Sequence, residues 1–143
     1  MTDAPAYDRR GLEILTRTEC DDLLAQGKIG RIGLQVAGET LVLPVLYCYL
    51  KGAVAFRTAP GEKLDSAWVK APASFEIDEW DVAQRTGWSV LVKGRFEEVS
   101  DPEEVAALDR SGLESWTPEV SHTTWVRITP TTITGRRIVP QLF

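Results

Sequence analysis

A succession of strand-like segments joined by tight turns is the feature that most limits what this chain can fold into. Lys28 to Val36 alternates apolar and polar residues, Thr40 to Tyr49 is an almost continuous apolar stretch, and Ala53 to Thr58 comes after another short turn. Alternation with a period of two is typical of a half-buried strand. The turns contain Ala37-Gly38-Glu39 and Leu50-Lys51-Gly52. We therefore predict a meander of three strands before any substantial helix.

Helix-start signals and further strand patterns occupy the rest of the chain. Thr16-Arg17-Thr18-Glu19 is a capping box, so a short helix is expected to begin there and to end at Gly27. Asp101 followed by Pro102 and two glutamates predicts a second helix start. We also expect one short helical piece and four strands, the last two as a hairpin, over Leu64–Val69, Ser74–Ile77, Gly87–Val99, Thr123–Ile128 and Thr131–Ile138.

Seven or so strands with only short helices favour a mainly β fold. We predict an antiparallel, six- to seven-stranded, Greek-key-like β-barrel with short helices rather than a parallel sheet. Residues 1–14 are expected to form a loose N-terminal arm whose apolar residues dock on the body. Residues 15–143 are assigned to one domain, because a chain of 143 residues suits one domain with a real core.

The charge balance argues against several classes of partner. The formal net charge is -5 and the pI is about 4.9, so a nucleic-acid surface, which needs a basic stripe, is not expected. No apolar stretch approaches the roughly 20 residues of a membrane span. The polar start, Met1 to Pro5, has no signal-peptide core, which favours the cytoplasm. His122 is the only histidine, so a histidine-rich metal site is excluded.

One segment concentrates the groups that bind a phosphate. At the end of a predicted strand it contains an arginine, a threonine hydroxyl, a Pro-Gly turn and a lysine, in the sequence Phe56-Arg57-Thr58-Ala59-Pro60-Gly61-Glu62-Lys63-Leu64. A phosphate dianion needs fixed cationic donors, a hydroxyl and loop amides that a glycine lets come close. The alternative for this segment alone is a surface turn with ordinary solvated charges.

A second segment, Gly87 to Arg95, is predicted to be a central strand. Trp88 and Ser89 open it, and the tryptophan is either a core residue or a flat ring that packs against a flavin. Arg136 and Arg137 add two cations near the C-terminus. Because consecutive strand residues point to opposite faces, at most one of these arginines should reach the same ligand, and a surface salt bridge is the alternative. We find no nucleophile with a base, so any chemistry should belong to a bound organic cofactor.

Together these segments resemble a known family, the pyridoxamine 5'-phosphate oxidase-like flavoproteins with a split β-barrel. The closer resemblance is to their short bacterial branch, which includes the nitroimidazole-reductase-like proteins. It covers roughly Leu15 to Ile138. The resemblance rests on the order and spacing of Gly30–Leu34, Pro44-Val45 with Tyr47, Phe56–Thr58 through Gly61 and Lys63-Leu64, Gly87–Val90 with Gly94-Arg95, and Thr134–Arg137.

The resemblance implies a homodimer that binds FMN in two clefts between subunits and acts as a flavin-dependent oxidoreductase on a small molecule. Arg57, Thr58 and Lys63 would match the family's phosphate-binding residues. Ser89 falls where the oxidases carry a flavin-contacting glutamine, and Trp88 beside it would line the cleft from the partner subunit. The strand from Pro44 to Tyr47 would run along the flavin ring. The candidate cofactor residues are Pro44, Val45, Tyr47, Arg57, Thr58, Gly61, Lys63, Leu64, Trp88, Ser89 and Arg136.

Departures from the oxidase pattern leave other functions open. The oxidases begin and end the strand at 40–49 with an arginine and a lysine, and neither is present here. Their C-terminal arginine-histidine motif is also missing, since Ile138 follows Arg137. Oxidation of pyridoxamine phosphate is therefore not expected. Relatives of this size that use a deazaflavin, a non-enzymatic flavin carrier or sensor, and an interaction module without cofactor are the alternatives.

Overall fold

A computed structural model of the chain describes residues 4–59, 70–114 and 123–140. The predicted phosphate-loop residues Gly61, Lys63 and Leu64, the expected helical piece at 64–69 and His122 lie outside the described residues. The described elements are β1 (Ala6–Tyr7), β2 (Glu13–Ile14), α1 (Arg17–Gln26), β3 (Ile29–Val36), β4 (Glu39–Leu46), β5 (Cys48–Leu50), β6 (Ala53–Thr58), β7 (Pro72–Asp81), β8 (Thr86–Glu98), α3 (Pro102–Asp109) and β9 (Thr124–Ile138).

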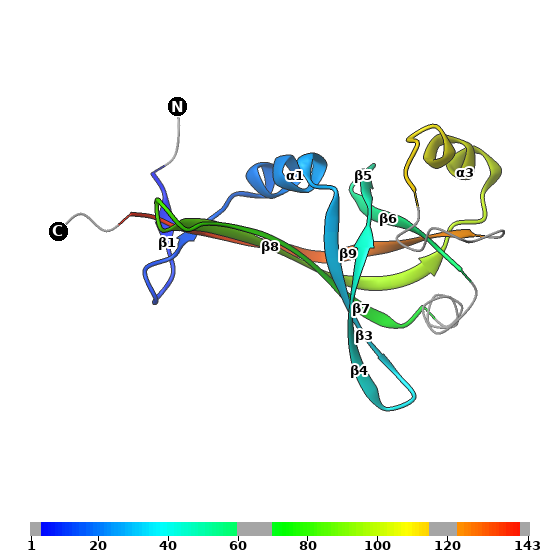
Figure 1. Cartoon of the computed structure of the whole chain (residues 1–143), viewed down its shortest axis with the longest axis horizontal. Coiled ribbons are helices and arrows are strands. Elements are labelled where there is room, and N and C mark those ends of the chain that lie inside the picture. Colours follow the sequence, from blue (N-terminus) through cyan, green and yellow to red (C-terminus); the bar gives the residue numbers. More distant parts are fainter. Residues whose placement is uncertain (1–3, 60–69, 115–122, 141–143) are drawn as a thin grey trace.

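The strands form one antiparallel sheet in the order β1-β2-β9-β8-β7-β3-β4, with β6 joined to both β9 and β5. The first third of β9 pairs with β6, residues near its end pair with β2, and β8 runs along nearly its whole length. In Figure 1 the long β8–β9 pair spans the molecule, helices α1 and α3 lie on one side of it, and the β3–β4 hairpin extends to the other. The predicted mainly β, antiparallel barrel with short helices is confirmed.

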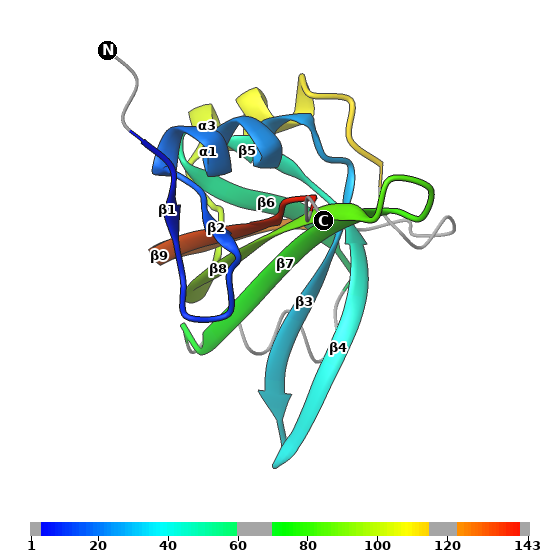
Figure 2. The same cartoon turned by 90° about the vertical axis from the view of Figure 1, so that its left-hand side faces the viewer.

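Three local predictions differ in detail from the structure. The expected C-terminal hairpin is a single strand, β9, because Pro130 sits beside a register shift between Lys93 and Gly94, where a proline costs no ladder hydrogen bond. The predicted strand at 40–49 is divided between β4 and β5 at Tyr47. The N-terminal arm contributes two short strands, β1 and β2, which extend the sheet beside β9 (Figure 2). These additions account for the strands beyond the predicted six or seven.

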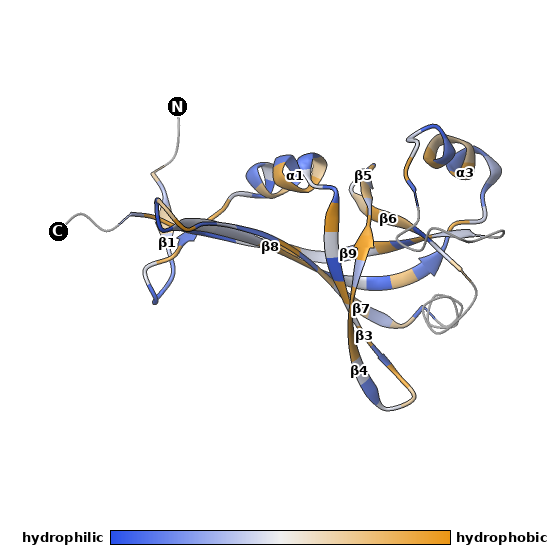
Figure 3. Ribbon diagram, in the orientation of Figure 1, coloured by the Kyte–Doolittle hydropathy of each residue, from blue (hydrophilic) through white to orange (hydrophobic). Residues whose placement is uncertain are grey.

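Apolar and polar residues alternate along the strands, so one face of the sheet carries the main core (Figure 3). Phe56, Phe75 and Phe96 are fully buried in this core, and Leu24 of α1 closes it. The capping box begins α1 as predicted: Thr16 accepts from the Glu19 amide, and the Glu19 carboxylate accepts from the Thr16 amide. Each fully buried phenylalanine of this kind contributes about 3–5 kcal/mol against truncation to alanine.

A second, smaller core lies beneath α3. It contains Ala55, Val99, Leu108 and Trp125. The Trp125 indole donates to the Asp109 carboxylate at 2.8 Å and ties the end of the helix to β9. Asp101 caps this helix by accepting from the Glu104 amide, as the sequence predicted. No helix among the described residues is long and apolar enough to cross a membrane.

Candidate functional site

The sheet has an outer face, meaning the side directed away from the main core, and this face carries Ser89 and Arg136. The two residues are directly opposite each other on β8 and β9. Asp78 of β7 lies opposite Ser89 on the other side, so the three side chains form one row across three strands. Two residues that the sequence placed in one site are therefore neighbours in the structure, although 46 residue positions separate them in the chain.

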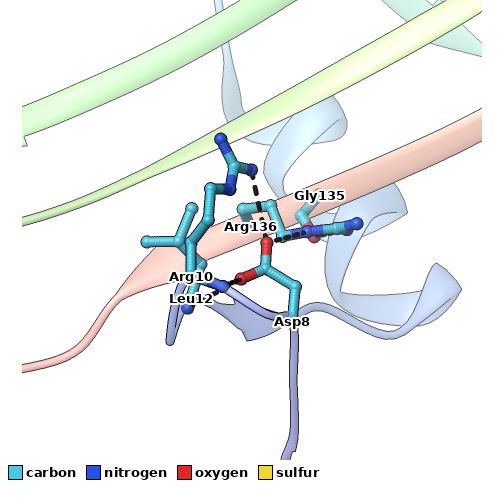
Figure 4. A network of polar contacts seen from close by, with 5 residues as sticks. All are labelled: Asp8, Arg10, Leu12, Gly135 and Arg136. Atoms are coloured by element: carbon cyan, nitrogen blue, oxygen red, sulfur yellow. Dashed lines mark hydrogen bonds and ion pairs between the residues drawn. The ribbon is translucent and has the colours of Figure 1, made fainter.

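Arg136 is held by the N-terminal hairpin. Its Nε donates to Asp8 Oδ2 at 3.1 Å, and Asp8 also accepts from the amides of Arg10 and Leu12 at 2.8 and 3.1 Å (Figure 4). Desolvation alone would raise the pKa of Asp8. The hydrogen bonds from Leu12, Arg10 and Arg136 outweigh it and lower this pKa to about 2. Asp8 is thus ionised at neutral pH and neutralises Arg136.

Trp88 and Arg137 lie on the other face of the same two strands. They are opposite each other in the β8–β9 ladder, and Trp88 packs against the main core. Arg137 forms ion pairs with Glu13 at 3.4 Å and Glu19 at 3.2 Å. The prediction that Arg136 and Arg137 point to opposite faces is confirmed, and Arg136 is the one beside Ser89.

The strand segment predicted to run along a flavin ring presents Pro44 and Leu46 to the outer face. Pro44 lies there, opposite Arg31 of β3. Val45 and Tyr47 are each 2% exposed and belong to the main core. The Tyr47 hydroxyl donates to the Leu24 carbonyl at 2.7 Å, and burial raises the pKa of this phenol well above its ordinary value. The side chains of Val45 and Tyr47 therefore pack on the core side of this segment, away from the outer face.

Arg57 and Thr58 end β6 and point to opposite faces of it. The Arg57 guanidinium lies 5.7 Å from the centre of the Trp125 ring and donates from Nε and Nη2 to the Thr123 hydroxyl at 2.9 and 2.6 Å. Among the described residues Arg57 has no carboxylate partner. Thr58 is 3% exposed, and its hydroxyl donates to the Ala59 carbonyl at 3.2 Å. Arg57 and Thr58 were expected beside one phosphate, so this divergence was not predicted.

A charged cluster occupies the middle of the outer face. Arg31 pairs with Glu76 at 3.3 Å and with Asp78 at 3.2 Å. Desolvation, followed by the hydrogen bond and charge of Asp78, raises the pKa of Glu76 to about 7 against the opposing effect of Arg31. Glu76 therefore holds or releases a proton near neutral pH, one strand away from Ser89.

The outer face also contains a groove of about 750 Å³ that the sequence analysis missed. Lys93 and Arg95 of β8 supply its charge, and Gln35, Ser74 and Thr131 are among its polar lining residues. No acidic residue lines it, and neither cation has a carboxylate partner in the described part of the chain. The available signal was the segment Lys93-Gly94-Arg95, whose two cations flank a glycine.

These features suit the binding of an anion better than acid-base or nucleophilic catalysis. In the outer-face row the polar groups are the Ser89 hydroxyl, the Arg136 guanidinium and the Asp78 carboxylate. Both cysteines are free; burial raises the pKa of the Cys20 and Cys48 thiols, which keeps them in their unreactive form. The charge of the groove is of the kind that attracts phosphate.

Comparison with known proteins identifies the family. The family model described as pyridoxamine 5'-phosphate oxidase matches residues 16–137. The uncharacterized protein Rv0080 of Mycobacterium tuberculosis is 38% identical over 130 residues, which cover 87% of this chain and 84% of the relative. The structure of a FAD binding protein from Mycobacterium smegmatis is 40% identical and has a TM-score of 0.73, covering 88% of this chain and 99% of the other.

A more distant structure shares the fold alone. It comes from Bacteroides thetaiotaomicron and belongs to a protein proposed to confer resistance to 5-nitroimidazole antibiotics, with 16% identity and a TM-score of 0.68. It covers 96% of this chain and 93% of the other. The fold is the split β-barrel that the family resemblance implied. The family model matches most of the length of the chain, which shows that the chain belongs to the pyridoxamine 5'-phosphate oxidase family.

Proposed function

We propose that this protein is a flavin-binding homodimer, and that it is an oxidoreductase acting on a small molecule. The observation that carries the proposal is the groove on the outer face, in which Lys93 and Arg95 have no acidic residue beside them among the described lining residues, in an otherwise acidic chain. The name of the Mycobacterium smegmatis relative, a FAD binding protein, supports a flavin as the anionic ligand.

The residues present fit a flavin. Its phosphate requires a cation that is not already neutralised, and Arg57 satisfies this requirement among the described residues. Lys93 and Arg95 also have no carboxylate partner in the described part of the chain, and they are available to the rest of an anionic flavin ligand. From the sequence, Lys63 would add a further charge. The Ser89 hydroxyl is on the outer face, where it is placed to donate to or accept from a ring heteroatom. Pro44 offers an apolar surface on the same face.

When bound, the flavin supplies hydride or electron transfer. The work of the chain is then to anchor the phosphate, orient the ring and keep a face open to the substrate. Glu76 adds a carboxyl that holds a proton near neutral pH, close to Ser89 and Arg31. We infer FMN as the cofactor, a cleft shared by two subunits as its site, and the cytoplasm as the compartment.

The test is an absorbance spectrum of the purified protein, followed by titration with FMN, FAD and a deazaflavin while tryptophan fluorescence is recorded. Oxidised bound flavin should give bands near ~370 and ~450 nm. A band near ~420 nm only with the deazaflavin would assign the protein to the deazaflavin-dependent relatives. Turnover with NADH or NADPH separates an oxidoreductase from a carrier or sensor. Binding of none of the three cofactors would refute the proposal.

A further inference from the structure

The groove on the outer face extends well beyond what a single phosphate needs. Its volume of about 750 Å³ falls in the range of clefts that bind small organic ligands, roughly 300–1,000 Å³. Lys93 lies four residues from Ser89 on the same face of β8, which places it about 13 Å along the strand. A ligand that contacts both residues must therefore be long.

The lining of the groove matches the parts of an adenylate. Lys93 and Arg95 supply charge for a phosphate, and Arg95 Nη1 is anchored by donating to the Lys70 carbonyl at 3.2 Å. The Ser74 hydroxyl lies in the same lining and suits a ribose hydroxyl. The Thr131 hydroxyl donates to the Lys93 carbonyl at 3.0 Å and is left to accept from a second ribose hydroxyl. Pro72, directly opposite Arg95 in the β7–β8 ladder, gives an apolar surface for a base.

A glycine keeps the groove open. Gly33 of β3 lies opposite Ser74, and a Cβ added at Gly33 would meet no atom closer than Ser74 Cβ at 3.9 Å. Neither steric crowding nor a left-handed backbone requires glycine here. A side chain at this position would occupy part of the groove while leaving the strand intact.

We propose that this groove is the subsite for the adenylate half of a dinucleotide. The inference rests on the proposed function, because it places the adenylate beside the flavin site. Two dinucleotides carry this chemistry: FAD, whose adenylate is joined to the flavin itself, and a nicotinamide dinucleotide that would donate electrons. The experiment distinguishes them.

The experiment measures dissociation constants of FMN, FAD and 5'-AMP for the wild type, and of NADPH for the FMN-loaded protein. The variants are Gly33→Val and the double change Lys93→Gln with Arg95→Gln. The charge-matched control is the double change Lys51→Gln with Arg110→Gln, at two exposed positions outside the groove. Removing charge-assisted contacts should weaken dinucleotide binding by at least about tenfold. Thermal melting of each variant verifies that it is folded.

Weaker binding of FAD with unchanged FMN would support the subsite and assign its adenylate to the flavin. Weaker binding of NADPH alone would support it and assign the adenylate to the electron donor. Equal loss of FMN and FAD would overturn the inference, since the groove would then hold the flavin's own phosphate, and the proposed function would stand. Unchanged binding of every nucleotide in both variants would also overturn it. If the wild type bound no flavin, the proposed function would fail, and AMP binding that the variants abolish would still support the subsite.

Discussion

Lys63 is the residue on which the predicted phosphate site depends most, because it places a positive charge two residues after Gly61 of the Pro-Gly pair that follows Arg57 and Thr58. Lys63→Ala should remove a charge-assisted contact worth about 1.5–3 kcal/mol, or one to two orders of magnitude in flavin affinity. Fluorescence titration measures the change. Lys51→Ala, in the turn between β5 and β6, is the control and should bind flavin like the wild type. A wild-type dissociation constant for Lys63→Ala would remove this residue from the site.

The raised pKa of Glu76 predicts how the stability of the protein depends on pH. Its pKa is about 7 in the folded chain and near the ordinary 4.5 when unfolded, so between these values the folded state binds more protons. Stability contributed by this group therefore falls as the pH rises from about 4.5 to 7. Glu76→Gln removes the titration, and its melting temperature relative to the wild type should be higher at pH 8 than at pH 5.

The control for this prediction is Glu79→Gln, an exposed carboxylate on the same strand, β7. Its difference from the wild type should not follow the pattern seen for Glu76. If the difference in melting temperature between Glu76→Gln and the wild type were the same at both pH values, the inference that the folded chain raises the pKa of Glu76 would be wrong.

At the scale of elements, the N-terminal hairpin β1–β2 is held to β9 by the contacts of Asp8. Asp8→Asn removes the charge that Arg10 and Arg136 share, so the hairpin should open more often. Trypsin cleavage after Arg9 and Arg10 should accelerate severalfold, whereas Asp22→Asn, an exposed change on α1, should leave it unaltered.

The pH dependence gives a second readout of the same contact. Because the pKa of Asp8 is lowered to about 2 from an ordinary 3.8, its contribution is complete above about pH 4 and is lost as the pH falls through 2. Between pH 6 and 8 Asp8 stays ionised, so the hairpin should stay docked to the same extent. The rate of wild-type cleavage should therefore not change over this range through opening of the hairpin. Equal cleavage rates for Asp8→Asn and the wild type would show that other contacts hold the hairpin.

Elements with local signals were predictable, and contacts between distant residues were not. The capping box at Thr16 and the Asp101-Pro102 pair fixed two helix starts because their hydrogen bonds join residues three apart. Pro130 was read as a turn, since the register shift that accommodates it involves another strand. The partner of Arg136 is Asp8, 128 residues away, and no local pattern indicates it.

The same limit applies to the candidate site. Strand alternation correctly separated Arg136 from Arg137, and it places Trp88 and Ser89 on opposite faces. The groove of Lys93 and Arg95 forms only when β7 and β3 align beside β8, so the sequence offered two charges without their acid-free surroundings. Whether a cation has an acidic residue beside it depends on which strands the fold places next to its own.

At the scale of the whole molecule, the β3–β4 hairpin has an apolar outer face without a covering element among the described residues. Ile29 and Val42 lie on this face and are 51% and 67% exposed. β4 is also an edge strand, since its only partner in the described sheet is β3. Exposed apolar residues on an edge hairpin are typical of an interaction surface, which fits the proposed homodimer.

Val42→Lys tests whether assembly and flavin binding are linked. Burying a lysine in the subunit interface should shift the protein toward monomers, and flavin should dissociate as the dimer does, because the cleft is proposed to be shared. The added charge is positive, so loss of flavin could not be attributed to repulsion of its phosphate. Val82→Lys, which is 78% exposed in the turn joining β7 and β8, is the matched control. Sedimentation across a dilution series, recorded at protein and flavin wavelengths, gives both quantities. Flavin retained by a genuine monomer would mean that each subunit holds its cofactor alone.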